Sequence, residues 1–221
     1  MSSAPQSPFP PDIADARARL GASYRRLGHA IAGHLVEVDV LDRLTTALDA
    51  ATAELDALPA RDRVSERPTG DWGPPPASGE AMFSFDERPV SGRAAPLGFD
   101  VSVTRDGDEA VGRLTLGKAH EGAPSRSHGG IISALFDDLF GFVLTIAEQA
   151  GFTGELTIRY EAGTPIGVPL VCRVRMVERV GRKLLMTGEL TPESDETQVF
   201  ARATATFIAI DPERFRQLTT D

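Results

Sequence analysis

The chain has 221 residues and a formal net charge of −9, and apolar residues make up 41% of it. This length and composition predict one ordinary globular domain with a real hydrophobic core, together with an extension. The acidic balance argues against a nucleic-acid-binding surface, because a protein that neutralises phosphates needs a basic excess. It leaves room for a small basic pocket.

The sequence shows no metal-binding or membrane-spanning pattern. Cys172 is the only cysteine, and the four histidines show neither of the common zinc-binding spacings (His29, His34, His120, His128). The first fifteen residues lack the basic start and the apolar run of a signal peptide, and no uninterrupted apolar run is long enough to span a bilayer. We therefore expect a cytoplasmic protein with no metal site and no nucleic-acid or membrane partner.

Residues 1–58 are predicted to form a helical extension. Apolar residues recur at intervals of three and four from Asp15 to Leu58, which indicates one long amphipathic helix or two helices joined near Gly33. This stripe either packs on the domain or on a partner, or it serves as a dimerisation or lid helix. Residues 59–79 are rich in proline and glycine and predict an exposed linker, in which Trp72 packs over an unknown surface.

Residues 80–213 are predicted to form the main domain, followed by a C-terminal tail at 214–221. The hydrophobic period changes to two after Glu80, with a hairpin signal at Asp106-Gly107. A helix is predicted from Ser127 to Ala150 with Gly151 as its C-terminal cap, and four more strands follow. This order predicts an α+β fold in which an antiparallel sheet wraps around one buried central helix.

The predicted central helix has a broad apolar arc and an unusual beginning. Asp137 and Asp138 fall on the two margins of this arc. Ser127 is a plausible N-cap, and the glycines Gly129 and Gly130 leave the first-turn N–H groups uncovered by side chains. Such groups can stabilise a carbonyl oxygen that gains negative charge. The alternative is a tight strand-to-helix turn in which His128 caps or packs.

The order of motifs in this region resembles a known family. The segments "HGGIISALFDDLFG", "TGELTIRY", "TPIGVPL", "VERVGRKLLMTGEL" and "ARATATFIAI" are similar to those of the hotdog-fold acyl-CoA thioesterases of the phenylacetate-pathway (PaaI-like) type. The resemblance is close from Ala119 to Ile210 and looser in the earlier strands. It implies a hotdog fold, a homodimer that can pair again as a dimer of dimers, and hydrolysis of an acyl-CoA substrate without a further cofactor.

The resemblance also implies roles for individual residues. The N–H of Gly129 would polarise the thioester carbonyl, Asp137 would act as general base or less often as nucleophile, and Thr153 would orient the attacking water. His128 is implied to be a positioning residue rather than a proton shuttle. One departure is Gly122, which stands where many relatives carry asparagine or glutamine.

Helix geometry gives an independent reason to expect a dimer. Gly129 and Asp137 are eight residues apart, so their backbones lie about 12 Å apart along a helix. A base must approach to about 3 Å from the water it activates, and that water must nearly touch the bound carbonyl. We therefore expect two composite sites, each with Gly129 from one subunit and Asp137 from the other. Otherwise Asp137 is an exposed acid or pairs with an arginine such as Arg159.

Further residues are candidates for substrate binding. Gly130 and Asp138 flank the expected catalytic groups, although Asp138 can instead be a solvated or salt-bridged acid. Coenzyme A carries phosphates that need local cations. The candidate cations are Arg126, Arg173, Arg175, Arg182 and Lys183, and each can instead be an ordinary strand-edge or turn charge. The leading hypothesis is an acyl-CoA thioesterase, and the alternative is a non-catalytic hotdog module that binds acyl-CoA or a protein. A hotdog hydratase ranks last because its Asp-His dyad motif is missing.

Overall fold

The computed structural model describes residues 7–62 and 74–211. Trp72 and the predicted tail at 214–221 lie outside the described residues. The elements in chain order are α1 (Pro11–Gly33), α2 (Val38–Asp56), β1 (Ala81–Met82), β2 (Val101–Asp106), β3 (Glu109–Thr115), the 3₁₀ helix η1 (Lys118–His120), α3 (Gly129–Ile146), β4 (Gly151–Tyr160), β5 (Pro169–Val180), β6 (Lys183–Pro192) and β7 (Ala201–Ala209).

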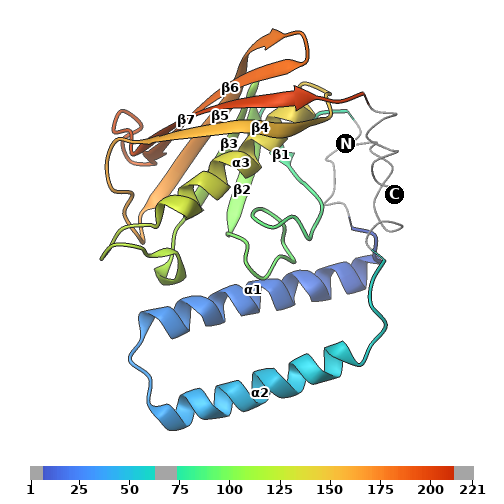
Figure 1. Cartoon of the computed structure of the whole chain (residues 1–221), viewed down its shortest axis with the longest axis vertical. Coiled ribbons are helices and arrows are strands. Elements are labelled where there is room, and N and C mark those ends of the chain that lie inside the picture. Colours follow the sequence, from blue (N-terminus) through green and yellow to red (C-terminus); the bar gives the residue numbers. More distant parts are fainter. Residues whose placement is uncertain (1–6, 63–73, 212–221) are drawn as a thin grey trace.

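The strands form one antiparallel sheet that wraps around α3 (Figure 1). Their order is β1-β2-β3-β5-β6-β7-β4, so β4 is an edge strand. The predicted hairpin is confirmed, because Asp106 pairs with Glu109 across a two-residue loop in which Gly107 has a φ of 61°. The predicted α+β architecture, with an antiparallel sheet around a central helix and helices at the N-terminus, is likewise confirmed.

The core lies between α3 and the inner face of the sheet. β7 contributes only small residues at three successive inward positions, Ala201, Ala203 and Ala205, which leaves room for the large side chains of α3. A Cβ at Gly188 of β6 would come 3.1 Å from the ring of Phe136, so glycine there lets the helix approach the sheet closely. α3 is long and apolar enough to span a membrane, but here it is the buried helix of a folded domain.

Both ends of α3 differ from the prediction. The N-cap is His128 rather than Ser127, and the helix ends at Ile146. Gly151 is not the C-terminal cap, because it is the first residue of β4. Instead, Glu148 takes the left-handed conformation with a φ of 51°, and the carbonyls of the last turn accept N–H groups from residues 147–149.

The N-terminal region contains two helices that separate after Gly33, and they run antiparallel with α1 nearer the domain (Figure 1). In the single chain most of the apolar stripe does not pack on the domain, since Leu20, Tyr24 and Ile31 of α1 are exposed and α2 buries no residue. Packing on a partner, dimerisation and a lid role stay predictions. α1 contacts the domain through a face that contains Gly21 and Arg25. A Cβ at Gly21 would come 2.8 Å from the carbonyl of residue 94, so glycine at this position permits the close approach.

Candidate active site

At the beginning of α3 the backbone N–H of Gly129 has no hydrogen-bond partner among the described residues. His128 Nδ1 accepts the N–H of Gly130 at 3.0 Å, and the carbonyl of His128 accepts the N–H of Ile131 at 3.0 Å. The N–H of Gly129 donates to no described residue. The free donor at this helix terminus, where the helix dipole favours negative charge, is therefore Gly129, whereas the donor of Gly130 is already used.

His128 acts here as a cap. Since its Nδ1 accepts a hydrogen bond, the neutral ring carries its proton on Nε2. This contact fixes the orientation of the ring and of the first helical turn. The geometry agrees with a positioning residue and with the capping alternative that the sequence left open.

Tyr160 is a contributor to this site that the sequence analysis missed. Its hydroxyl donates to the carbonyl of Gly129 at 2.9 Å and lies 3.0 Å from Ser133 Oγ. A Cβ at residue 129 would come 3.0 Å from the same hydroxyl, which explains why this position is glycine. Tyr160 ends β4, so its proximity depends on how the sheet wraps around the helix, and no local motif indicates it.

Position 122 is glycine for a steric reason. Its N–H donates to the carbonyl of Arg126 at 2.9 Å and closes a tight turn before the helix. A Cβ at Gly122 would come 2.9 Å from the Cα of His128. An asparagine or glutamine therefore does not fit this loop, and the departure from the family pattern is built into the local backbone.

Asp137 lies on the exposed side of α3 and is held by the following strand. Thr153 Oγ1 donates to Asp137 Oδ1 at 2.7 Å. The side chain is not paired with Arg159, whose guanidinium instead contacts Glu161 at 3.2 Å. In the single chain Asp137 is also not enclosed by the buried rings of Phe136 and Phe140.

Asp138 is buried in an ion pair, which agrees with the salt-bridged alternative for this residue. Its side chain is 5% exposed, and its Oδ1 accepts a hydrogen bond from Arg88 Nε at 2.6 Å. Arg88 also donates to the backbone carbonyl of Asp138 and lies 4.7 Å from the centre of the Phe142 ring. Asp138 therefore attaches the segment before β2 to the helix.

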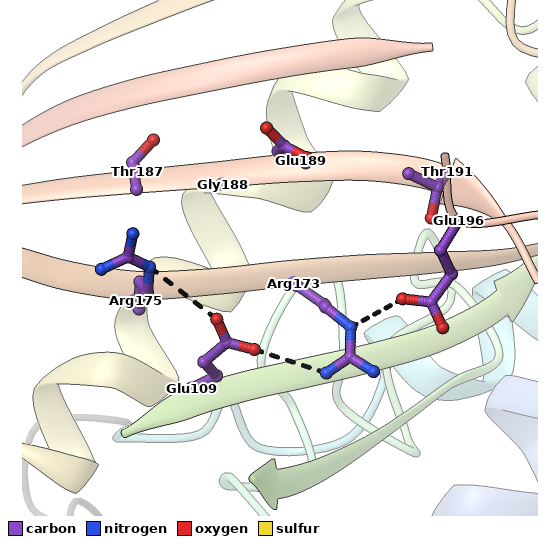
Figure 2. A pocket seen from close by; sticks show the side chains of 8 residues that line it. All are labelled: Glu109, Arg173, Arg175, Thr187, Gly188, Glu189, Thr191 and Glu196. Atoms are coloured by element: carbon purple, nitrogen blue, oxygen red, sulfur yellow. Dashed lines mark hydrogen bonds and ion pairs between the residues drawn. The ribbon is translucent and has the colours of Figure 1, made fainter. Parts of the chain in front are cut away.

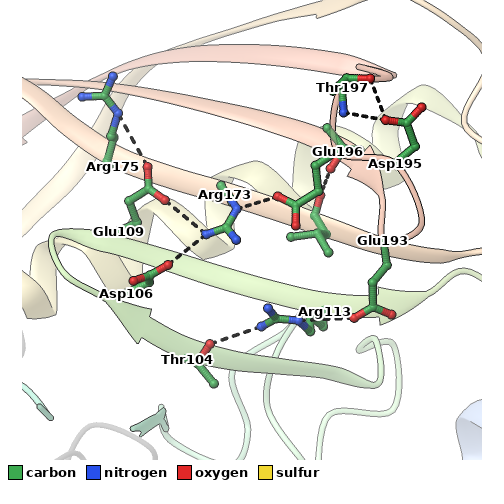
Figure 3. Close-up of polar contacts among 12 residues, drawn as sticks. Thr104, Asp106, Glu109, Arg113, Arg173, Arg175, Glu193, Asp195, Glu196 and Thr197 are labelled. Atoms are coloured by element: carbon green, nitrogen blue, oxygen red, sulfur yellow. Dashed lines mark hydrogen bonds and ion pairs between the residues drawn. The ribbon is translucent and has the colours of Figure 1, made fainter. Parts of the chain in front are cut away.

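Two of the candidate cations, Arg173 and Arg175, lie on the outer face of the sheet. A hollow of about 330 Å³ lies there. Figure 2 shows the residues that line it, Glu109, Arg173, Arg175, Thr187, Gly188, Glu189, Thr191 and Glu196. Arg173 contacts Glu196 at 2.8 Å and Asp106 at 3.2 Å (Figure 3). The arginine holds the pKa of Glu196 below its usual range. Because acids already neutralise these arginines, the hollow does not suit a phosphate.

The other candidate cations flank the ends of β4. Arg126 lies in the loop before Gly129, and its backbone forms an isolated antiparallel β-bridge with Pro165. Arg182 and Lys183 lie at the β5–β6 turn, where Lys183 pairs with Ile208, and Ile208 pairs with Phe152 at the beginning of β4. None of these three cations forms an ion pair with a described residue. No group of three or more metal-binding side chains occurs in 7–62 and 74–211.

Comparison with known proteins identifies the fold. A solved thioesterase-superfamily protein has a TM-score of 0.72 and 23% identity to this chain, and the match covers 87% of this chain and 94% of that protein. The chain has a hotdog fold. No family model matches it.

Curated proteins similar to part of this chain are named acyl-coenzyme A thioesterases. THEM4 of Mus musculus is 32% identical over 94 residues, which are 42% of this chain and 40% of that protein. THEM5 of Mus musculus is 28% identical over 97 residues, which are 44% of this chain and 39% of that protein. The chain thus spans less than half the length of these relatives.

Within the hotdog sheet, the two halves of the candidate site lie at opposite ends of β4. Gly129 contacts Tyr160 at the end of the strand, and Asp137 contacts Thr153 near its beginning. β4 is hydrogen-bonded to β7 on one side only, and most of its residues are exposed. One chain therefore carries both halves but holds them apart.

Proposed function

We propose that the chain hydrolyses an acyl-CoA thioester to the free acid and coenzyme A. The observation that carries this proposal is the free N–H of Gly129 at the beginning of α3, with a carboxylate, Asp137, held by Thr153 at the other end of the same edge strand. The names of the curated relatives support the choice of substrate class.

Pairing of two β4 strands across a twofold axis would assemble the site. A ten-residue edge strand with unpaired backbone groups is a natural surface for strand addition. Antiparallel pairing places the Tyr160 end of one strand beside the Thr153 end of its partner. The same operation brings Gly129 of one subunit toward Asp137 of the other, and the symmetry creates two equivalent sites.

The chemistry follows from these positions. Asp137 of one subunit removes a proton from water, and the resulting hydroxide attacks the thioester carbonyl carbon. The N–H of Gly129 in the other subunit stabilises the oxyanion, a contribution of about 3 kcal/mol when the donor is preorganised. The C–S bond then breaks, and protonated Asp137 gives its proton to the thiolate of coenzyme A. By donating to one carboxylate oxygen, Thr153 leaves the second oxygen to act on water.

The same pairing offers cations to the phosphates of coenzyme A. Arg126 lies on the Gly129 side of the proposed site, and Arg182 and Lys183 lie at the end of the sheet that carries Asp137. In the dimer, Arg126 of one subunit and the other two cations from its partner would therefore flank one site. Arginine can bind phosphate through paired N–H groups. The scheme uses no metal or redox cofactor.

A panel of acyl-CoAs tests the class of activity. The purified chain is incubated with each acyl-CoA and a thiol reagent that detects released coenzyme A. We expect repeated turnover with at least one member. Stoichiometric binding without turnover would instead support the alternative, a hotdog module that only binds acyl-CoA, for which the missing polar side chain at Gly122 is the favouring observation.

Mixed dimers test the composite site. Gly129→Val and Asp137→Asn chains, each inactive in our scheme, are co-expressed with different tags, and the heterodimer is isolated by tandem purification. One of its two sites then combines Gly129 with Asp137, so we expect about half of the wild-type activity per dimer. An inactive heterodimer would show that the two residues act within one chain.

A further inference from the structure

The N-terminal helix α1 contacts the loop that leads into the candidate active site. His29 Nδ1 accepts the N–H of Ala119 at 3.0 Å. The His29 ring meets the ring of His120 edge-on, with 4.7 Å between the ring centres. A Cβ at Gly117 would come 2.7 Å from the His29 ring, so the backbone of the loop is fitted closely around this imidazole.

Hydrogen bonds connect this loop to the residue that precedes Gly129. The carbonyl of His120 accepts the N–H of His128 at 2.9 Å, and His120 Nδ1 accepts the N–H of Gly117 at 3.2 Å. His128 in turn caps α3 and directly precedes Gly129. Two hydrogen bonds and one ring contact thus connect a side chain of the extension with the first turn of the central helix.

We propose that His29 is a positioning residue for the N–H of Gly129, and that α1 is therefore part of the catalytic unit. This inference rests on the proposed thioester hydrolysis. In this proposal His29 acts through the turn at Gly117–His120 and through His128. The expected effect is on kcat, because the orientation of an oxyanion donor matters most in the transition state.

A separate anchor allows the role of His29 to be isolated from the attachment of α1. Arg25, one turn earlier on the helix, donates to the carboxylate of Asp100 at 2.6 Å and to the carbonyl of Ala95 at 2.8 Å. The Arg25 side chain is 7% exposed. Loss of His29 should leave this buried anchor and the position of α1 intact, so the consequences should be confined to the loop.

Three variants test the proposal with the best substrate of the acyl-CoA panel. His29→Ala removes the acceptor for Ala119, His29→Asn keeps an acceptor at a similar reach, and His34→Ala is a control on exposed His34 at the end of the same helix. We expect His29→Ala to lower kcat about 10-fold with KM changed less than about 2-fold. His29→Asn should recover most of the loss, and His34→Ala should match the wild type.

Amide hydrogen exchange provides a readout that does not depend on activity. In His29→Ala we expect faster exchange at Ala119 and His128, and unchanged exchange in the buried middle of α3. Wild-type kcat in His29→Ala, or no recovery in His29→Asn, would overturn the inference while leaving the proposed function in place. A wild-type chain that turns over no acyl-CoA would instead overturn the proposed function.

Discussion

Thr153 Oγ1 lies 2.7 Å from Asp137 Oδ1 and donates a hydrogen bond to it, so an exposed carboxylate on α3 is fixed by the strand that follows the helix. An exposed carboxylate on a helix surface ordinarily samples several rotamers. Here one oxygen is held by the hydroxyl and the other remains available.

Asp137→Asn should lower kcat about 100-fold or more, because the amide cannot take a proton from water. The side chain is exposed in the chain and nearly isosteric, so we expect little change in unfolding free energy or in the oligomeric state. Steady-state kinetics and size-exclusion chromatography with light scattering check both statements. Equal activity in the variant would remove Asp137 from the mechanism.

Asp138→Asn should lower the stability of the fold, in contrast to Asp137→Asn. The substitution leaves the partly buried guanidinium of Arg88 without its counter-charge, and breaking such a pair costs about 3 kcal/mol of unfolding free energy. The measurement is urea unfolding followed by circular dichroism, with Asp137→Asn as the matched control one residue away. A stability loss that is equal in the two variants would contradict the structural role of Asp138.

Gly129→Ala should lower kcat, because the new Cβ would lie 3.0 Å from the Tyr160 hydroxyl and would displace this hydroxyl from the carbonyl that it holds at the first turn of α3. Combining it with Tyr160→Phe removes the oxygen that causes the contact, so part of the activity should return. Kinetics of the two single variants and the double variant form the test. Strictly additive losses in log kcat would show that the two residues are not coupled.

His120 should make stability depend on pH in the acid range. Burial, and then the nearby His29, lower its pKa from 6.5 to about 4, while Asp100 partly opposes this shift. Between these pH values the unfolded chain binds a proton that the folded chain does not, so stability is lost as pH falls from about 6.5 to about 4. The loss is about 3 kcal/mol at most.

Carboxyl groups titrate in the same range, so a matched variant is needed to isolate the histidine. His120→Asn keeps an acceptor for the N–H of Gly117 but does not titrate. The difference between wild-type and variant unfolding free energies, measured from pH 7 to pH 4, should therefore change with pH in the direction given above. A constant difference would mean that His120 titrates alike in the folded and unfolded chains.

The sequence predicted the sheet and its central helix because their patterns are local. Alternating residues such as Leu170 and Cys172, and the Asp106-Gly107 turn, indicate strand and hairpin without knowledge of the rest of the chain. The helix ends were less accessible, since either Ser127 or His128 could cap. Only the three-dimensional path of the loop decides between them.

The partners of the site residues could not be predicted for a different reason. Arg88 reaches Asp138 across 50 residues of sequence, and Tyr160 reaches Gly129 only because the sheet wraps around the helix. Both contacts depend on tertiary geometry that has no periodic signature. The sequence shows that Asp137 and Asp138 lie on the two margins of the apolar arc of the helix. Which of the two is exposed depends on the segment before β2, whose Arg88 pairs with Asp138.

The lone thiol has a practical consequence. Cys172 lies fully buried against α3, and burial raises its pKa far above the usual range, so it should not react with maleimides while the domain is folded. Any cysteine introduced on the surface would then be the single site of attachment for a fluorophore. Subunit exchange between donor-labelled and acceptor-labelled chains could thus be followed by energy transfer without removing a native residue.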